Sequence, residues 1–265
     1  MDQRLSRARI YAEHYQAVVC YCNYIGGQDE LVFDGQSFIF HPKDHLVALA
    51  PCAHTALIDT CNPTMHPKPF TSSHPMAMTH ELIKLSIQDY MQNNHLKHVV
   101  VGLSGGIDSA LCLALLAECL PSEFIHAYYL PSPYSSDLSE SLANEQCQML
   151  GIKLETINIS PLIKAYEHHL GQTIPVTNTL VHQNIQARIR ANILMAAANE
   201  HQALLIATSN KSEAAMGYTT LYGDMAGGFA PLKDCFKTEV YELANDCNHH
   251  AITIPQGVID REPTA

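Results

Sequence analysis

The chain has 265 residues, of which 47% are hydrophobic, so it is long enough to bury one large core or two modest ones. It carries 26 acidic and 15 basic side chains, a formal net charge of −11 with histidine counted as neutral. Because binding to a nucleic-acid backbone depends on clustered Lys and Arg, this balance argues against a nucleic-acid partner. No apolar run approaches the ~20 residues that a membrane-spanning helix needs, so we expect no membrane partner either.

Nine cysteines are present, none of them in a Cys-x-x-Cys pair, and the N-terminus shows no secretory signal pattern. We therefore expect a cytoplasmic protein whose cysteines are reduced and mostly buried. The sixteen histidines are scattered, and the adjacent pairs at 168–169 and 249–250 lack the spacing of zinc ligands.

Residues 15–52 are expected to form strands. Apolar runs cover 17–24, 31–33, 37–40 and 46–50, and residues 41–44 have the composition of a hairpin turn. Residues 53–78 contain four prolines among Ser, Thr, His and Asn, which indicates an exposed linker.

From residue 79 onward the pattern alternates between helix and strand. Helices are predicted over 79–93, 108–119, 137–150, 181–200 and near 233–247, and strands over 97–103, 124–130, 152–158 and 203–208. Short, continuously apolar strands between helices predict the α/β class, a Rossmann-like parallel sheet with helices on both faces. In such sheets the ligand lies beyond the carboxyl ends of the strands.

The most informative segment follows the strand at 97–103 and reads Ser104-Gly105-Gly106-Ile107-Asp108-Ser109. Two glycines remove the Cβ atoms that would keep the backbone from phosphate oxygens, and they tolerate a positive φ. The first N–H groups of the following helix favour negative charge at the same point. The two serines add hydroxyl donors, and the aspartate is placed to hold Mg²⁺ against phosphates. Gly-Gly alone is also typical of a tight turn, so the prediction of a phosphate cradle depends on the whole pattern.

This loop resembles the pyrophosphate-binding loop of the ATP pyrophosphatases, and further motifs in one order resemble the NAD synthetase family specifically. They are residues 131–136 (PSPYSS), 186–190 (QARIR), 208–213 (TSNKSE) and 217–224 (GYTTLYGD), followed by PLKD at 231–234 and KT at 237–238. The match covers about 79 to 262. It implies an adenine nucleotide alpha hydrolase-like fold and a synthetase domain over 79–265 that is incomplete at its C-terminus.

The resemblance implies a role for each matched position. The residues that it implies for ATP are Gly102, Leu103, Ser104, Gly105, Gly106, Ile107, Asp108, Ser109, Thr208 and Lys237. Those that it implies for the metal are Asp108 and Glu213, and those for deamido-NAD are Asn184, Arg188, Glu213 and Asp224. Taken singly, each polar side chain is equally consistent with a solvated surface residue.

Residues 23–37 resemble the closing part of the nitrilase-type glutaminase domain of glutamine-dependent NAD synthetases. We therefore interpret 1–52 as a small β-rich remnant of that nitrilase-like domain, and the whole sequence as a fragment of a longer enzyme. The family's glutaminase Glu, Lys and Cys lie upstream of this segment, so we expect no glutaminase catalytic residue in this chain. Cys20 and Cys22 are expected to be buried strand residues rather than nucleophiles.

The implied reaction is the ATP-dependent amidation of deamido-NAD to NAD⁺ through an acyl-adenylate, with release of AMP and pyrophosphate. ATP would be a co-substrate and Mg²⁺ the cofactor, the partners would be small molecules, and a homo-oligomer through the synthetase domain is expected. Glutamine supplies the nitrogen in the intact family, whereas this chain is expected to use ammonia. Two alternatives stay open: another adenylating ATP pyrophosphatase, which the 208–224 motifs disfavour, and an inactive truncated product.

Overall fold

The structure is a computed structural model that describes residues 2–28, 31–43, 45–49, 76–174 and 178–262. The chain divides into two compact units, Met1–Tyr90 and Met91–Ala265. Most of the predicted linker, residues 53–75, lies outside the described residues, and helix α2 (Ala77–Asn93) begins just after them.

The first unit contains helix α1 (Asp2–Tyr15), most of α2 and two small antiparallel sheets. Strand β4 (Phe38–His41) pairs with both β1 (Val19–Tyr21) and β5 (His45–Leu49), and β2 (Ile25–Gln28) pairs with β3 (Leu31–Asp34). Helix α1 (Asp2–Tyr15) buries Ala8 and Ala12 against Phe38 and Phe40. The strands expected over 15–52 are confirmed, whereas α1 was not predicted from the sequence.

Cys20 and Cys22 are exposed, so the prediction that both are buried was wrong. Strand β1 is the edge strand of its sheet, and successive side chains of a strand point to opposite faces. Val19 and Tyr21 pack against the apolar cluster beneath α1, which directs Cys20 to the other face. Because α1 covers the face that carries Val19 and Tyr21, the apolar run of β1 indicates burial on that face only.

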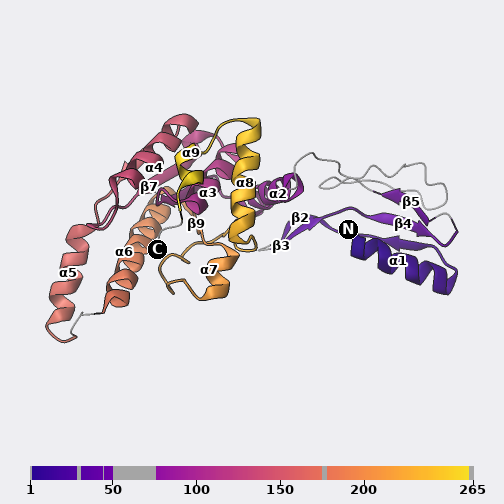
Figure 1. The fold of residues 1–265 in the computed structure, drawn as a ribbon, viewed down its shortest axis with the longest axis horizontal. Coiled ribbons are helices and arrows are strands. Elements are labelled where there is room, and N and C mark those ends of the chain that lie inside the picture. Colours follow the sequence, from indigo (N-terminus) through magenta and orange to yellow (C-terminus); the bar gives the residue numbers. More distant parts are fainter. Residues whose placement is uncertain (1, 29–30, 44, 50–75, 175–177, 263–265) are drawn as a thin grey trace. The chain divides into compact units, whose positions relative to one another are not determined.

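The second unit is built on four parallel strands in the order β8-β7-β6-β9. Figure 1 labels β7 and β9 among the helices of this unit. Their bounds are β6 His98–Leu103, β7 Ile125–Tyr129, β8 Leu154–Thr156 and β9 Ala203–Ile206. Val99, Val100 and Val101 in the central strand β6 are fully buried. Because both faces of this strand are covered, the sequence shows a continuous apolar run there instead of an alternating pattern. The predicted Rossmann-like class is confirmed.

Helices cover both faces of this sheet. One face carries α3 (Ile107–Cys119), and three further helices pack against α3: α4 (Asp137–Leu150), α8 (Lys237–His250) and α9 (Gln256–Asp260). The opposite face carries α5 (Ser160–Gly171) and α6 (Thr179–His201), which bury Ile163, Ile185 and Ile189 against Val100 and Leu205. Two short helical turns, η1 (Ser122–Phe124) and α7 (Lys211–Met216), lie in the connections. Within the described ranges, no helix combines the length and apolarity needed to cross a membrane.

The order of the strands creates a crevice beside β6. The chain runs outward from β6 through β7 to β8, then returns through α5 and α6 to place β9 on the other side of β6. The connections through α3 and α4 and the return through α5 and α6 therefore lie on opposite faces of the sheet, so the strand order reverses beside β6. Ligands bind at such a switch point in open α/β sheets.

Three histidine side chains lie next to one another, from β6, from β7 and from the last residue of α6. His98 Nδ1 lies 3.1 Å from His126 Nε2, and the rings of His126 and His201 stack with centroids 3.8 Å apart. His201 Nε2 in turn lies 3.1 Å from the Tyr128 hydroxyl. Burial lowers the pKa of His126 from its usual value, and the neighbouring His201 and His98 add to that effect. The fold thus favours a neutral His126.

Acid should destabilise the fold partly through His126. Below the usual histidine pKa of about 6.5, the unfolded chain takes up this proton more readily than the folded chain, so the free energy of unfolding falls as the pH drops. We expect His126→Gln to reduce the loss of melting temperature between pH 7.5 and pH 5. The exposed His168, changed to Gln, is the control and should leave that loss as in the parent. An unchanged pH dependence in His126→Gln would contradict this prediction.

Candidate active site

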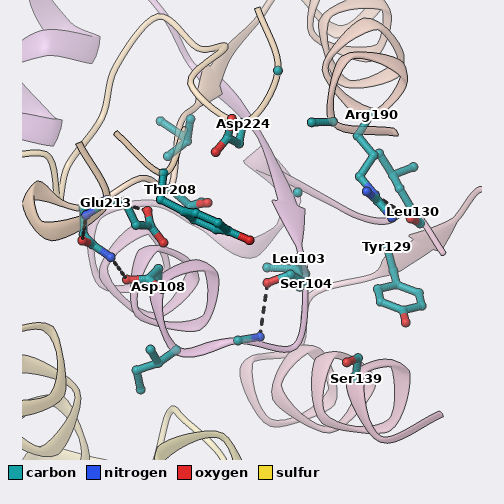
Figure 2. A pocket seen from close by; sticks show the side chains of 18 of the residues that line it. Leu103, Ser104, Asp108, Tyr129, Leu130, Ser139, Arg190, Thr208, Glu213 and Asp224 are labelled. Atoms are coloured by element: carbon teal, nitrogen blue, oxygen red, sulfur yellow. Dashed lines mark hydrogen bonds between the residues drawn. The ribbon is translucent and has the colours of Figure 1, made fainter. Parts of the chain in front are cut away.

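A cavity of about 810 Å³ opens at the carboxyl ends of the central strands (Figure 2). Its walls come from the loop after β6, the end of β7, the start of α4, the middle of α6 and the segment after β9. Lys237 and Tyr241 of α8 complete them with Val258, Arg261 and Glu262. The ATP residues expected from the sequence that line it are Gly102, Leu103, Ser104, Gly106, Ile107, Asp108, Thr208 and Lys237.

The two glycines of the Ser-Gly-Gly loop have different structural roles. Gly105 has φ +73°, and a Cβ built on it would lie 2.5 Å from the backbone oxygen of Ser139 at the start of α4. It is therefore required for packing as well as for backbone conformation. Gly106, which precedes α3, has φ −100°, and its Cβ would meet only the Ser104 hydroxyl, at 3.2 Å. Gly106 is thus the glycine that leaves space on the cavity side.

The two serines of the loop also differ. Ser109 is buried, and its hydroxyl donates to the Gly106 carbonyl oxygen at 3.0 Å and accepts from the Ser104 N–H at 3.2 Å. It fastens the loop from beneath and does not line the cavity. Ser104 is exposed, lines the cavity and accepts the Gly106 N–H at 3.2 Å. Of the two hydroxyls expected to contact phosphate, only that of Ser104 faces the space a phosphate would enter.

A cluster of charges lies where the loop meets the segment after β9. Asp108 Oδ2 forms an ion pair with Lys237 Nζ, and Asp108 Oδ1 accepts a hydrogen bond of 2.7 Å from Asn210 Nδ2. Glu213 lies at the start of α7, and its carboxylate accepts the Asn210 N–H at 3.2 Å. Burial raises the pKa of the Glu213 carboxyl, the Asn210 N–H opposes this rise, and the negative charge of Asp108 adds to it. The two carboxylates expected to share a metal therefore lie within electrostatic reach of each other.

Thr208 lies two residues beyond β9 and faces the same part of the cavity. Figure 2 shows Thr208, Glu213 and Asp108 grouped on one side, with Tyr129, Leu130 and Arg190 on the other. The segment that carries Thr208 is held in line with the sheet because Ala207 N–H donates to the Phe229 carbonyl oxygen at 2.9 Å.

The residues expected to bind deamido-NAD occupy two different settings. Asp224 lines the cavity, and its carboxylate also accepts the Thr220 N–H at 2.6 Å. Asn184 and Arg188, on α6, do not line the cavity: Asn184 Oδ1 accepts the Thr220 hydroxyl at 2.8 Å, and Arg188 Nε donates to the Leu221 carbonyl oxygen at 3.2 Å. All three side chains hold the loop at residues 217–224, which borders the cavity.

Several cavity residues were not identified as site residues from the sequence. Arg190 lies within the QARIR motif, and its Nε donates to the Leu130 carbonyl oxygen at 3.0 Å. Arg261, close to the end of the chain, donates to the Ser139 hydroxyl at 2.9 Å. Position within a motif could have indicated Arg190. Nothing local marks Arg261, which reaches the site only through the packing of α9.

The chain is similar in sequence and in fold to known proteins. A family model described as NAD synthase matches residues 79–265. The chain belongs to the NAD synthase family. It is 41% identical over 259 residues to a glutamine-dependent NAD(+) synthetase of Xylella fastidiosa, a match that covers 94% of this chain and 48% of that protein. The chain spans about half the length of the curated relatives it matches.

Solved NAD synthetase structures have the same fold. The glutamine-dependent NAD+ synthetase of Acinetobacter baumannii in complex with ADP superposes with a TM-score of 0.86 at 33% identity, over 100% of this chain and 52% of that chain. The NH3-dependent NAD synthetase of Campylobacter jejuni, in complex with the nitrate ion, superposes with a TM-score of 0.60 at 34% identity, over 66% of this chain and 74% of that chain. The family resemblance read from the motifs is therefore confirmed.

The two glycines provide a test of the loop. Gly105→Ala adds a Cβ at a positive φ, which costs about 1–2 kcal/mol, and also forces it against the Ser139 backbone, so the melting temperature should fall clearly. Gly106→Ala should remain close to the parent in stability and should bind pyrophosphate more weakly, because its new methyl group enters the space above the loop. Melting curves and pyrophosphate titrations of both variants check this, and parent-like affinity in a folded Gly106→Ala would show that the loop is only structural.

Proposed function

We propose that this chain forms the adenylating site of an NAD⁺ synthetase, which uses ATP to convert deamido-NAD to NAD⁺. The observation that supports this most directly is the convergence of Asp108, Lys237 and Glu213 beside the Ser-Gly-Gly loop at the switch point of the sheet. These groups provide opposite charges and backbone donors at one place, as a triphosphate requires. A relative that was solved with ADP and that covers the whole chain adds support.

The donor set also fits a magnesium ion. Asp108 and Glu213 offer carboxylate oxygens on the same side of the cavity, and Mg²⁺ prefers one or two carboxylates together with substrate phosphates. When bound, the ion would neutralise charge on the phosphates of ATP. Lys237, which pairs with Asp108, lines the same cavity and would contact the same phosphates.

In the proposed reaction, an oxygen of the nicotinate carboxylate attacks the α-phosphorus of ATP. A new P–O bond forms, the bond from that phosphorus to pyrophosphate breaks, and the pyrophosphate leaves toward the loop at 104–109. Ammonia then attacks the acyl carbon, the bond to AMP breaks, and the nitrogen loses a proton to give the amide. The chain contributes position and charge: the N–H groups at the start of α3 and the Lys237 ammonium face the leaving group, and no covalent bond to the protein is needed.

The dinucleotide would lie on the side of the cavity bordered by the 217–224 loop. Asp224 and Glu213 line the cavity there and are proposed to contact it directly. Asn184 and Arg188 are proposed to act by holding that loop against α6, since their side chains form hydrogen bonds with Thr220 and Leu221.

Removal of either proposed metal ligand should weaken the magnesium-dependent part of nucleotide binding. We expect Asp108→Asn and Glu213→Gln each to lower the affinity for ATP in the presence of Mg²⁺ by about tenfold or more, and to change the affinity in EDTA much less. Calorimetric titration with and without Mg²⁺ measures both. Asp234→Asn, which breaks an exposed ion pair with Lys211 outside the cavity, is the control. Equal Mg²⁺ dependence in all four proteins would reject the assignment.

The purified chain should make NAD⁺ from ATP, deamido-NAD and an ammonium salt, with one AMP formed per NAD⁺. The C. jejuni relative, named as NH3-dependent, supports ammonia as a sufficient nitrogen source for this fold. Glutamine in place of ammonium should give no NAD⁺ above a blank, and Asp108→Asn serves as the inactive control. If ATP binds but neither nitrogen source yields product, the chain binds nucleotide without completing the reaction.

A further inference from the structure

We propose that Asn210 is a positioning residue, which fixes Asp108 relative to Glu213 so that the two carboxylates can bind one magnesium ion. The proposal rests on the function proposed above, and it assigns to a neutral, buried side chain the control of a charged site. Asn210 is 0% exposed, so both ends of its carboxamide need partners inside the protein.

Each end of that side chain bonds to a different part of the site. Asn210 Oδ1 accepts the Glu213 N–H at 3.0 Å, which caps the first turn of α7. In the opposite direction, the Glu213 carboxylate accepts the Asn210 N–H at 3.2 Å. Asn210 Nδ2 donates to Asp108 Oδ1 at 2.7 Å, 102 residues earlier in the chain. One planar amide therefore connects the turn that carries Glu213 to the loop that carries Asp108.

The chemistry of the site explains why a neutral amide suits this position. Asp108 and Glu213 repel each other, and Lys237, which pairs with the other oxygen of Asp108, brings a single positive charge to the two carboxylates. An aspartate at position 210 would cap the helix equally well but would add a third negative charge, whereas a serine would cap it without reaching Asp108. Asparagine carries its acceptor and its donor on separate atoms of one planar amide, so it can accept from the turn with one and donate to a more distant carboxylate with the other.

The same short segment also holds the third charged group. The Ser212 hydroxyl accepts the backbone N–H of Lys237 at 2.9 Å, and Lys211 N–H donates to the Cys235 carbonyl oxygen at 2.9 Å. Residues 210–213 thus anchor the start of α8 as well as the β6–α3 loop. A substitution of Asn210 should therefore misalign the carboxylates of Asp108 and Glu213, in addition to weakening the cap of α7.

The decisive comparison is Asn210→Ser with Asn210→Ala, because serine retains the cap and alanine loses it, while both lose the bond to Asp108. Asn178→Ser is the matched control: Asn178 caps α6 by accepting the Leu180 N–H at 2.9 Å, and its side chain is exposed. The readouts are the melting temperature and the affinity for ATP, each with Mg²⁺ and in EDTA.

If Asn210 positions Asp108, Asn210→Ser will lose about tenfold or more of the affinity for ATP in Mg²⁺. Its affinity in EDTA will remain within about twofold of the parent, and Asn178→Ser will behave as the parent in both media. If Asn210 is only a cap, Asn210→Ser will match the parent and Asn210→Ala alone will be impaired, which overturns the proposal. Should Asn210→Ser fail to fold, the closer-sized Asn210→Thr takes its place. Failure of both to fold would assign Asn210 to folding and reject the positioning role.

This design separates the two proposals. If the parent chain does not bind ATP in Mg²⁺, the proposed function fails and the role of Asn210 fails with it. If the parent binds and Asp108→Asn is impaired while Asn210→Ser is not, the magnesium site stands and only the role of Asn210 is rejected.

Discussion

The central strand β6 is hydrogen-bonded to β7 on one side and to β9 on the other, and the candidate site depends on this pairing. Val101 lies opposite Ile206, so the chain leaves β6 and β9 at nearly the same level of the sheet. The loop that begins at Ser104 and the segment that begins at Ala207 therefore emerge side by side, although about a hundred residues separate them. The hydrogen bond that Asn210 donates to Asp108 depends on this register.

The site combines rigid and charged parts in a definite way. Gly105 and the buried Ser109 give the loop its conformation through packing and internal hydrogen bonds, which leaves Gly106 and Ser104 on the cavity side. The charges of Asp108, Lys237 and Glu213 are held by backbone and side-chain bonds that converge on residues 210–213. Because the donors are already oriented, little reorganisation is required when a charged ligand enters.

The loop at 217–224 connects the site to α6. Two α6 side chains and the loop's own Asp224 hold it, yet Tyr222 at its tip is 77% exposed and has φ +61°. Asn184 and Arg188, which the family resemblance assigns to the substrate, can thus act indirectly, by ordering the backbone of the loop that borders the cavity. The distinction matters for mutagenesis, because loss of Asn184 or Arg188 would disturb the loop as a whole and not one ligand contact.

The sequence alone determined the fold class, most of the alternation of helices and strands in the second unit, and the family, because buried parallel strands and glycine-rich turns leave local signals. It did not determine α1, α5, the short helices α7 and α9, the exposure of Cys20, or the different structural roles of Gly105 and Gly106. Nor did it indicate that Lys237, 129 residues from Asp108, would pair with that carboxylate, or that Asn210 would join it. These features were decided by tertiary structure, since they depend on which surfaces the sheet brings together, and no local pattern of residues encodes a contact across that distance.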